Sequence, residues 1–339
     1  MRFANWTQYI DRASDGTSPT MAAFTAKTGI SVDYREEIDD NDTFAMAITP
    51  RLLARQDIDR DLMVLSDWMV TRLIRNGLLT PLELIRMPHA ALLLDPLKDV
   101  SFDPGRRYSL AWQSGFAGLG YHRGRVGRDL HAVGDLWTDD LAGKVALLSE
   151  MRDTLGLIML ARGVDISGPF GRAAVEEAAA EVGARIADGH VRHVRGNSYL
   201  EDFKAGTAWA GIVWSGDIAT LRQETGSDQW RFVLPDTGGT LWSDDIVIPV
   251  TSRRRRAAMA LIDYYYQPEV AAKVTESVRY ICPVAGTQAE VAKSDETLAA
   301  DPLVFPDAAF LRDHAREFRA LTPAEESEYG ALWASTTGI

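Results

Sequence analysis

Short apolar runs alternate with amphipathic segments along most of the chain. The runs are brief and rich in β-branched residues, so they predict strands over residues 30–34, 61–65, 144–148, 190–194, 209–214, 231–235 and 245–250. Helical periodicity falls after or between them, over residues 67–76, 151–163, 172–189 and 253–266, and the chain beyond residue 266 is mostly helical in pattern. Ser66 and Ser252 are the expected caps of two of these helices. Strands that alternate with helices of this length predict an α/β fold with largely parallel sheet.

The residues expected at the carboxyl ends of these strands are mainly aromatic and acidic. In an open α/β sheet, ligands bind at those ends, in the loops that lead into helices. Four of the nine tryptophans fall there, with carboxylates beside them: Trp6, Trp68, Trp214 and Trp242. Rings cover methylene groups and attract ammonium groups, and carboxylates bind ammonium groups through charge-assisted hydrogen bonds. One tryptophan alone would more often be a core residue, but the four together favour a site for an organic cation.

Composition narrows the class of protein. A chain of 339 residues suggests about two domains. Its 36 Lys and Arg residues against 48 Asp and Glu residues give a net charge of −12, which argues against a nucleic-acid partner. The single cysteine, Cys282, excludes an intramolecular disulfide and a CxxC metal site. The opening residues MRFANWTQYI do not form a signal peptide, so the protein is either cytosolic or has had such a peptide removed.

Signals of catalysis are weak. The chain contains no GxSxG, HExxH or P-loop motif. Gly118, Gly120 and Gly124 are misspaced for a dinucleotide site, and close approach of the backbone explains them better. Glu150 and Asp153 could form the acid/base pair of a hydrolase, and a raised pKa on one of them would favour that reading. Their position at the start of a helix instead favours two ionised groups that hold a cation.

Four stretches of the chain carry a resemblance to a known family: FANWTQYI at 3–10, DLMVLSDWMV at 61–70, AWAGIVWSGD at 208–217 and GGTLWSDDIVIP at 238–249. They resemble the polyamine-binding members of the extracellular solute-binding proteins, the periplasmic receptors of spermidine/putrescine ABC importers. The resemblance extends over nearly the whole chain. It implies a ligand site formed by Trp6, Thr7, Tyr9, Ser66, Trp68, Glu150, Asp153, Trp214, Trp242, Asp244 and Tyr280.

The resemblance also implies a fold and partners. We expect the two-lobed type II periplasmic binding protein fold, with the ligand cleft between the lobes. Lobe one would comprise residues 1–113 and 244–290, and lobe two residues 114–243 and 291–339. The ligand would be a polyamine or similar small-molecule cation, and the partner would be the permease of an ABC importer. The protein would be a periplasmic monomer without a cofactor, its signal peptide removed.

Two departures from the family pattern leave other ligands open. Arg279 stands where the family commonly has a glycine before Tyr280, and Arg319 stands near the place of a ligand-binding amide. Either arginine would suit an anionic or zwitterionic solute held by the same fold. For a cationic ligand we expect Asp244 to bind one end and Glu150 and Asp153 the other. The neighbouring Asp245 should point away in an extended segment, so its substitution should cost little affinity.

Overall fold

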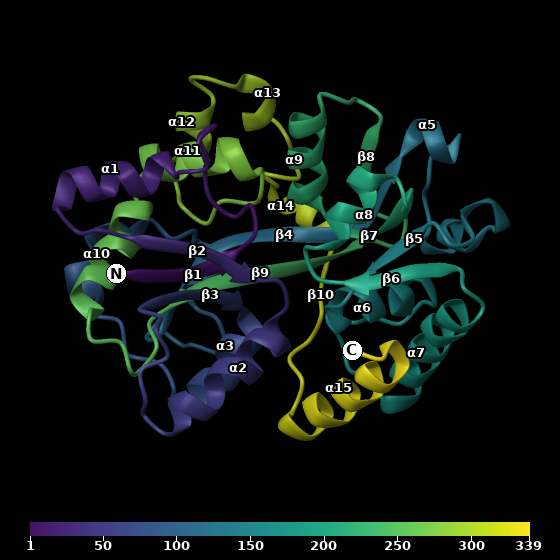
Figure 1. Cartoon of the computed structure of the whole chain (residues 1–339), viewed down its shortest axis with the longest axis horizontal. Coiled ribbons are helices and arrows are strands. Elements are labelled where there is room, and N and C mark those ends of the chain that lie inside the picture. Colours follow the sequence, from purple (N-terminus) through teal and green to yellow (C-terminus); the bar gives the residue numbers. More distant parts are fainter. The chain divides into compact units, whose positions relative to one another are not determined.

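The computed structural model describes residues 1–339 and divides them into two compact units (Figure 1). Unit 1 comprises Met1–Ser114 and Ser243–Pro306, and unit 2 comprises Gly115–Trp242 and Asp307–Ile339. The chain therefore passes between the units three times, within strand β4, within strand β9 and after Pro306. None of the helices is both long enough and apolar enough to cross a membrane.

Unit 1 contains the strand order β2 (Asp33–Ile38), β1 (Arg2–Trp6), β3 (Leu62–Ser66) and β9 (Gly239–Val247). The first three strands are parallel and β9 is antiparallel to β3. Four consecutive buried residues in β3 account for its continuous apolar run. The helices of this unit are α1 (Pro19–Thr28), α2 (Asn41–Leu53), α3 (Asp67–Arg75), α4 (Asp95–Lys98), α10 (Arg255–Tyr265), α11 (Pro268–Val278), α12 (Thr287–Val291) and α13 (Glu296–Ala299), with short turns η1 (Leu84–Arg86) and η2 (Pro88–Leu92).

Unit 2 contains the strand order β4 (Ser109–His122), β7 (Ala210–Trp214), β5 (Val145–Leu148) and β6 (Val191–Arg195). Strands β7, β5 and β6 are parallel, whereas β8 (Trp230–Val233) and β7 both run antiparallel to β4. The short β10 (Ala315–Glu317) pairs with the first residues of β9. The helices of this unit are α5 (Arg123–Val126), α6 (Met151–Ala161), α7 (Arg172–Ala187), α8 (Tyr199–Ala205), α9 (Ser215–Thr225), α14 (Ala308–His314) and α15 (Pro323–Thr337), with turns η3 (Val133–Trp137) and η4 (Asp139–Leu141).

The close approach expected of the glycines in β4 occurs inside unit 2. A Cβ atom on Gly118 would lie 2.6 Å from the carbonyl oxygen of Val233, and one on Gly120 would lie 2.3 Å from a methyl group of Val213. Either side chain would push a neighbouring strand away. These glycines therefore serve strand packing and not a dinucleotide.

Two strands begin at other places than the sequence pattern predicts. The strand expected at 30–34 begins only at Asp33, because its pairing with β1 starts at Arg2 opposite Asp33. The strand expected at 245–250 already begins at Gly239, because residues 239–241 pair with β10. Trp242 and Asp244 therefore lie within a strand and not in a turn before it.

The expected boundary of the second lobe at residue 291 is wrong. Residues 291–306 belong to unit 1. Val291, Leu298 and Val304 are buried together with Ala272 of α11, in a small hydrophobic cluster that holds this segment in unit 1. A boundary set by packing of this kind cannot be seen in the periodicity of the segment itself.

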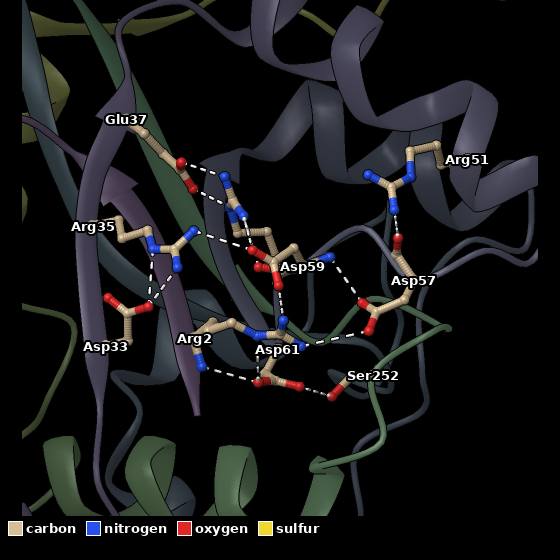
Figure 2. A network of polar contacts seen from close by, with 10 residues as sticks. Arg2, Asp33, Arg35, Glu37, Arg51, Asp57, Asp59, Asp61 and Ser252 are labelled. Carbon is tan, nitrogen blue, oxygen red and sulfur yellow. Dashed lines mark hydrogen bonds and ion pairs between the residues drawn. The ribbon is translucent and has the colours of Figure 1, made fainter.

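Ser252 joins a polar network and does not cap α10 directly. Its hydroxyl accepts a hydrogen bond from the Arg254 backbone at 3.1 Å and donates to Asp61 at 2.9 Å, and the helix begins at Arg255. Figure 2 shows the network around Asp61, which also accepts from the Arg2 backbone at 2.9 Å. The further ion pairs join Asp33, Arg35, Glu37, Asp57, Asp59 and Arg60. The centre of the network, Asp61 with Arg2, lies at the amino-terminal ends of β1 and β3, the opposite strand ends from Trp6 and Ser66.

Candidate functional site

Asp244 is the centre of a buried polar cluster in unit 1. Its side chain is 5% exposed. The Tyr9 hydroxyl donates to Oδ2 at 2.9 Å, and the Ser66 hydroxyl donates to Oδ1 at 2.6 Å. Ser66 reaches Asp244 because the two residues are opposite each other across β3 and β9. Ser66 stands at the N-cap position of α3 but makes no capping hydrogen bond.

Asn41 completes this cluster and was not found by sequence analysis. Its amide Nδ2 donates to the Ser66 hydroxyl at 2.9 Å, and its Oδ1 accepts from the Ser66 backbone at 3.2 Å. The Ser66 hydroxyl therefore accepts from Asn41 and donates to Asp244. We name Tyr9, Asn41, Ser66 and Asp244 the Asp244 cluster. The sequence marks Asn41 only as a residue type common at helix starts.

The electrostatics of the Asp244 cluster favour a positively charged ligand. The pKa of Asp244 is raised to about 7, chiefly by burial; the hydrogen bonds from Ser66 and Tyr9 oppose this rise, and the nearby Asp67 and Asp245 add to it. Both hydrogen-bond donors to this carboxylate are neutral hydroxyls. Ionised Asp244 is thus a buried anion without a cationic partner from the protein, an arrangement that is costly until a cation arrives.

One aromatic contact reaches this cluster, through Tyr9. The Tyr9 and Tyr280 rings pack edge to face with centroids 5.4 Å apart. Trp6 is almost fully buried at the end of β1, whereas Trp68 in the first turn of α3 is partly exposed. Thr7 lies half-buried in the turn after β1 and makes neither of the hydrogen bonds that hold Asp244. A ligand role for these residues stays a prediction.

Asp245 lies on the other face of β9 and has a partner of its own. Its Oδ1 accepts from Arg106 Nη1 at 2.8 Å, and the side chains of Asp245 and Arg106 are 0% and 4% exposed. Burial raises the pKa of Asp245 to about 6, and the guanidinium opposes that rise. Removing one member of such a buried pair costs roughly 3–5 kcal/mol. Asp245 is therefore unsuitable as a neutral control for Asp244, because its substitution affects stability.

Asp153 is the centre of a second buried cluster, in unit 2. Trp214 Nε1 donates to its Oδ2 at 2.8 Å, and the Thr240 hydroxyl donates to its Oδ1 at 2.7 Å. We name Asp153, Trp214 and Thr240 the Asp153 cluster. The start of α6 does not keep the pKa of Asp153 low, since burial raises it to about 6, although a carboxyl with this pKa is still mostly ionised at pH 7. Desolvation outweighs the favourable end of the helix dipole at this position.

Glu150 has a different environment from Asp153. Its carboxylate caps α6 by accepting from the Arg152 backbone at 3.3 Å, and Arg152 Nη1 lies 3.6 Å from the same carboxylate. Arg152 also faces Glu326 at 3.7 Å. The two acids are thus not equivalent. A raised pKa does not single out this pair as a hydrolase centre, because burial raises the pKa of Asp244 in the same way.

Trp214 lies beside two buried carboxylates of unit 2. Its indole donates to Asp153, and its backbone N–H donates at 3.3 Å to the Tyr199 hydroxyl, which itself donates to Asp217 at 2.8 Å. Asn197 Nδ2 also donates to Asp217, at 3.2 Å. The rings of Trp214 and Trp242 pack with centroids 6.5 Å apart. The sequence pattern placed Asp217 after the strand that ends at Trp214, but it gave no sign of Tyr199 or Asn197.

Arg279 and Arg319, the two arginines that could have bound an anionic ligand, each have a partner within the protein. Arg279 ends α11 in the left-handed conformation with φ 57°, which explains why a glycine suits this position, and it faces Asp295 at 3.6 Å. Arg319 donates to Glu325 at 2.6 Å and lies 4.1 Å from the centroid of the Phe170 ring. The bond from Arg319 lowers the pKa of Glu325 to about 2. Arg319 therefore serves the start of α15.

Comparison of the sequence with known protein families and proteins identifies the family of this chain. Residues 20–306 match the bacterial extracellular solute-binding proteins, and the chain belongs to that family. The spermidine/putrescine-binding periplasmic protein 1 of Haemophilus influenzae is 25% identical over 309 residues, which cover 91% of this chain and 81% of the relative. The putrescine-binding periplasmic protein SpuD of Pseudomonas aeruginosa is 26% identical over 324 residues, covering 89% and 82%.

A solved structure supports the same fold. An ABC transporter protein of Listeria monocytogenes has a TM-score of 0.84 and 24% identity, and the match covers 99% of this chain and 98% of that one. The α/β fold of the type II periplasmic binding proteins, predicted from the sequence, is confirmed.

Proposed function

We propose that this protein is a periplasmic receptor that binds a linear organic cation of the polyamine class and delivers it to an ABC importer. The observation that carries the proposal is Asp244, a buried carboxylate whose donors are two neutral hydroxyls. A ligand ammonium group supplies the positive charge that this site lacks. The relatives named for binding spermidine and putrescine support the choice of ligand class.

In this proposal the two carboxylate clusters bind the two ends of one ligand. Asp244 binds one ammonium group, with Tyr9 and Ser66 orienting its oxygens. Asp153 and Glu150 serve the other ammonium group. The methylene groups between the two ammonium groups pack on the faces of aromatic rings, which also attract the neighbouring positive charge. The rings and the hydroxyl assigned to this role are those of Trp6, Thr7, Trp68, Trp214, Trp242 and Tyr280.

The remaining parts of the proposal concern partners and location. The receptor is a monomer, meets the permease of an importer, and binds neither a cofactor nor a nucleic acid. We expect the reading frame of the gene to encode a signal peptide of about 15–30 residues ahead of this chain. A native start at Met1 with no upstream coding sequence would count against the periplasmic location.

Native mass spectrometry of the purified protein tests the ligand class first. The expected result is a bound molecule whose mass matches an amine. Intrinsic fluorescence during titration with putrescine, spermidine and agmatine should then saturate for at least one of them, because Trp214 belongs to the Asp153 cluster and three further tryptophans are assigned to the ligand. A response to anionic solutes and to none of the amines would contradict the proposal and favour a different solute on the same fold.

The proposal also states that the ligand leaves unchanged. The Glu150–Asp153 pair is divided between a helix cap with an arginine partner and a fully hydrogen-bonded carboxylate. Long incubation with the bound amine, followed by mass spectrometry of the small molecule, should recover it intact. Detection of a product would overturn the receptor assignment and favour a hydrolase.

A further inference from the structure

Helix α2 of unit 1 is apolar on two opposite sides. One side packs into the unit with four buried apolar residues: Phe44, Ala45, Ile48 and Leu52. The other side is exposed and is also apolar, with Met46, Ala47, Pro50 and Leu53. We name these four exposed residues the α2 strip. A surface helix ordinarily carries polar and charged residues on its outer side, and a helix that is apolar all round is ordinarily covered all round.

The α2 strip is continuous along the helix. Met46 and Leu53 are 71% and 59% exposed, and they lie two helical turns apart on the same side, with Pro50 between them. The other exposed large apolar side chains lie in the short turn η1 and at the end of the chain: Leu84, Ile85 and Ile339. Apolar side chains scattered singly over a surface need no partner, whereas a row along one helix is typical of a binding surface.

Two arginines at the carboxyl end of α2 give this surface a charge. Arg51 and Arg55 are exposed, and each donates to a backbone carbonyl, Arg51 to that of Asp57 and Arg55 to that of Gly77 at 3.1 Å (Figure 2 shows Arg51 and Asp57). Neither guanidinium forms an ion pair with a carboxylate of the protein, although the chain has 48 acidic and 36 basic residues. The surface therefore suits a partner whose apolar side chains have carboxylates beside them.

The size of the α2 strip and the position of the helix narrow the kind of partner. A helix of 13 residues is about 20 Å long, so the strip supplies only part of the ~800 Å² per partner that a stable interface buries. A second copy of this chain held by the strip alone would not stay bound. A receptor, in contrast, needs a partner that binds it and then releases it. The helix also begins at Asn41, which holds Ser66 against Asp244, so a partner on α2 contacts an element of the Asp244 cluster.

We propose that the α2 strip is the surface by which unit 1 docks on the permease of the importer, at a place where the permease presents apolar side chains with carboxylates beside them. The proposal rests on the proposed function, which supplies such a partner. Docking removes the apolar side chains from water, and the arginines at the end of the strip orient the contact.

Uptake of radiolabelled putrescine and spermidine tests this proposal, in cells of the source bacterium whose own copy of the gene is replaced by each variant. The main variant combines Met46→Gln and Leu53→Gln, because glutamine keeps the helix propensity and loses the apolar contact. Burial of one such apolar side chain corresponds to roughly ten- to a hundredfold in a dissociation constant, so we expect uptake at limiting receptor to fall at least tenfold. Arg55→Gln should lower uptake less, by up to about fivefold. Calorimetry on each purified variant should give the amine affinity of the wild type.

Ile85→Gln is the matched control, because Ile85 is 93% exposed in the same unit but lies outside α2. It should leave uptake unchanged. Unchanged uptake in the double variant, or an equal loss in Ile85→Gln, would overturn the docking surface and leave the receptor assignment intact. A loss of amine affinity in the double variant would assign the strip to ligand binding instead, and a wild-type dimer that the double variant dissociates would make a second copy the occupant. A wild type that binds neither amine and restores no uptake would contradict the proposed function, and the docking surface with it.

Discussion

Two adjacent carboxylates, on opposite faces of β9, have different kinds of hydrogen-bond donor. On one face, Asp244 is held by the hydroxyls of Tyr9 and Ser66. On the other face, Asp245 is held by the guanidinium of Arg106. Both side chains are buried, and burial raises the pKa of each. The difference lies in the source of the compensating charge, which the protein supplies to Asp245 and does not supply to Asp244.

We propose that this difference separates a structural acid, Asp245, from a ligand-binding acid, Asp244. A buried carboxylate with its own arginine holds elements together, here β9 and the segment before β4. A buried carboxylate with neutral donors is oriented but not neutralised, and it gains most from a cation that arrives from outside. Neutral donors alone do not mark a ligand site, since the buried Asp103 also accepts only from backbone N–H groups and the Ser109 hydroxyl. The role proposed for Asp244 rests as well on its position opposite Ser66, at the carboxyl end of β3.

The largest expected effect is on ligand affinity when Asp244 is replaced. Removing one partner of a buried ion pair costs roughly 3–5 kcal/mol, which is about two to three and a half decades of affinity. We expect Asp244→Ala near the upper end of this range and Asp244→Asn, which keeps shape and some hydrogen bonding, near the lower end. Asp99→Asn is the control, because Asp99 is an exposed acid of unit 1. Calorimetric titration that gives equal small losses for Asp244→Asn and Asp99→Asn would contradict the assignment.

Asp245→Asn should reverse the pattern and lower stability instead of affinity. The substitution leaves the Arg106 guanidinium buried without its anion, and we expect a loss of about 3 kcal/mol in the free energy of unfolding. Denaturant unfolding of the variant measures this loss. Titration of the folded variant with the amine should give an affinity close to that of the wild type. A large loss of affinity with unchanged stability would mean that both faces of β9 serve the ligand.

The dependence of stability on pH should follow the raised pKa values of Asp244 and Asp153. Between about pH 4 and pH 7 the folded protein keeps protons on these groups that the unfolded chain has released, so stability falls as the pH rises through this window. Thermal unfolding without ligand should therefore occur at a lower temperature at pH 8 than at pH 5. Amine should raise the unfolding temperature more at pH 8, where Asp244 is ionised. An equal increase at both pH values would contradict the link between ligand and carboxylate.

The smallest expected effect belongs to Asn41, which acts on the ligand through Ser66. Asn41→Ala removes the hydrogen bonds that orient Ser66, at a cost of about 1 kcal/mol or about fivefold in affinity. Thr43→Ala, an exposed position in the same turn of α2, should have no effect. Fluorescence titration distinguishes the two variants. Equal affinities would show that Ser66 is held well enough without Asn41.

The sequence predicted the fold class because the relevant signals are local. Short branched runs and helical periodicity lie within single segments, and most predicted strands and helices appear within a few residues of their expected positions. The errors occur where pairing between distant segments determines where a strand begins. Gly239 is an example, because it pairs with Ala315. The boundary expected at residue 291 failed for the same reason, since Val291 packs on Ala272.

The sequence indicated residue types for a candidate site, but it could not indicate their burial, their partners or their pKa values. Aromatic and acidic residues at strand ends pointed to Trp214, Asp153 and Asp244 before any geometry was available. The partner of Asp245 could not be predicted, because Arg106 lies 139 residues away in the chain. The raised pKa of Asp153 was missed because a helix start is visible in the sequence, whereas the degree of burial is not.

Counting the protons that exchange on binding tests the central claim most directly. With a pKa of about 7, Asp244 is about half protonated at pH 7, whereas an aliphatic amine is fully charged. If an ammonium group binds this carboxylate, calorimetry in buffers of different ionisation enthalpy should show the release of about half a proton per ligand at pH 7. The release should fall to about a tenth of a proton at pH 8, where Asp244 is already ionised and the amine is still charged, and it should be nearly absent in Asp244→Asn. Proton uptake at pH 7, or the same release in Asp244→Asn, would contradict the account.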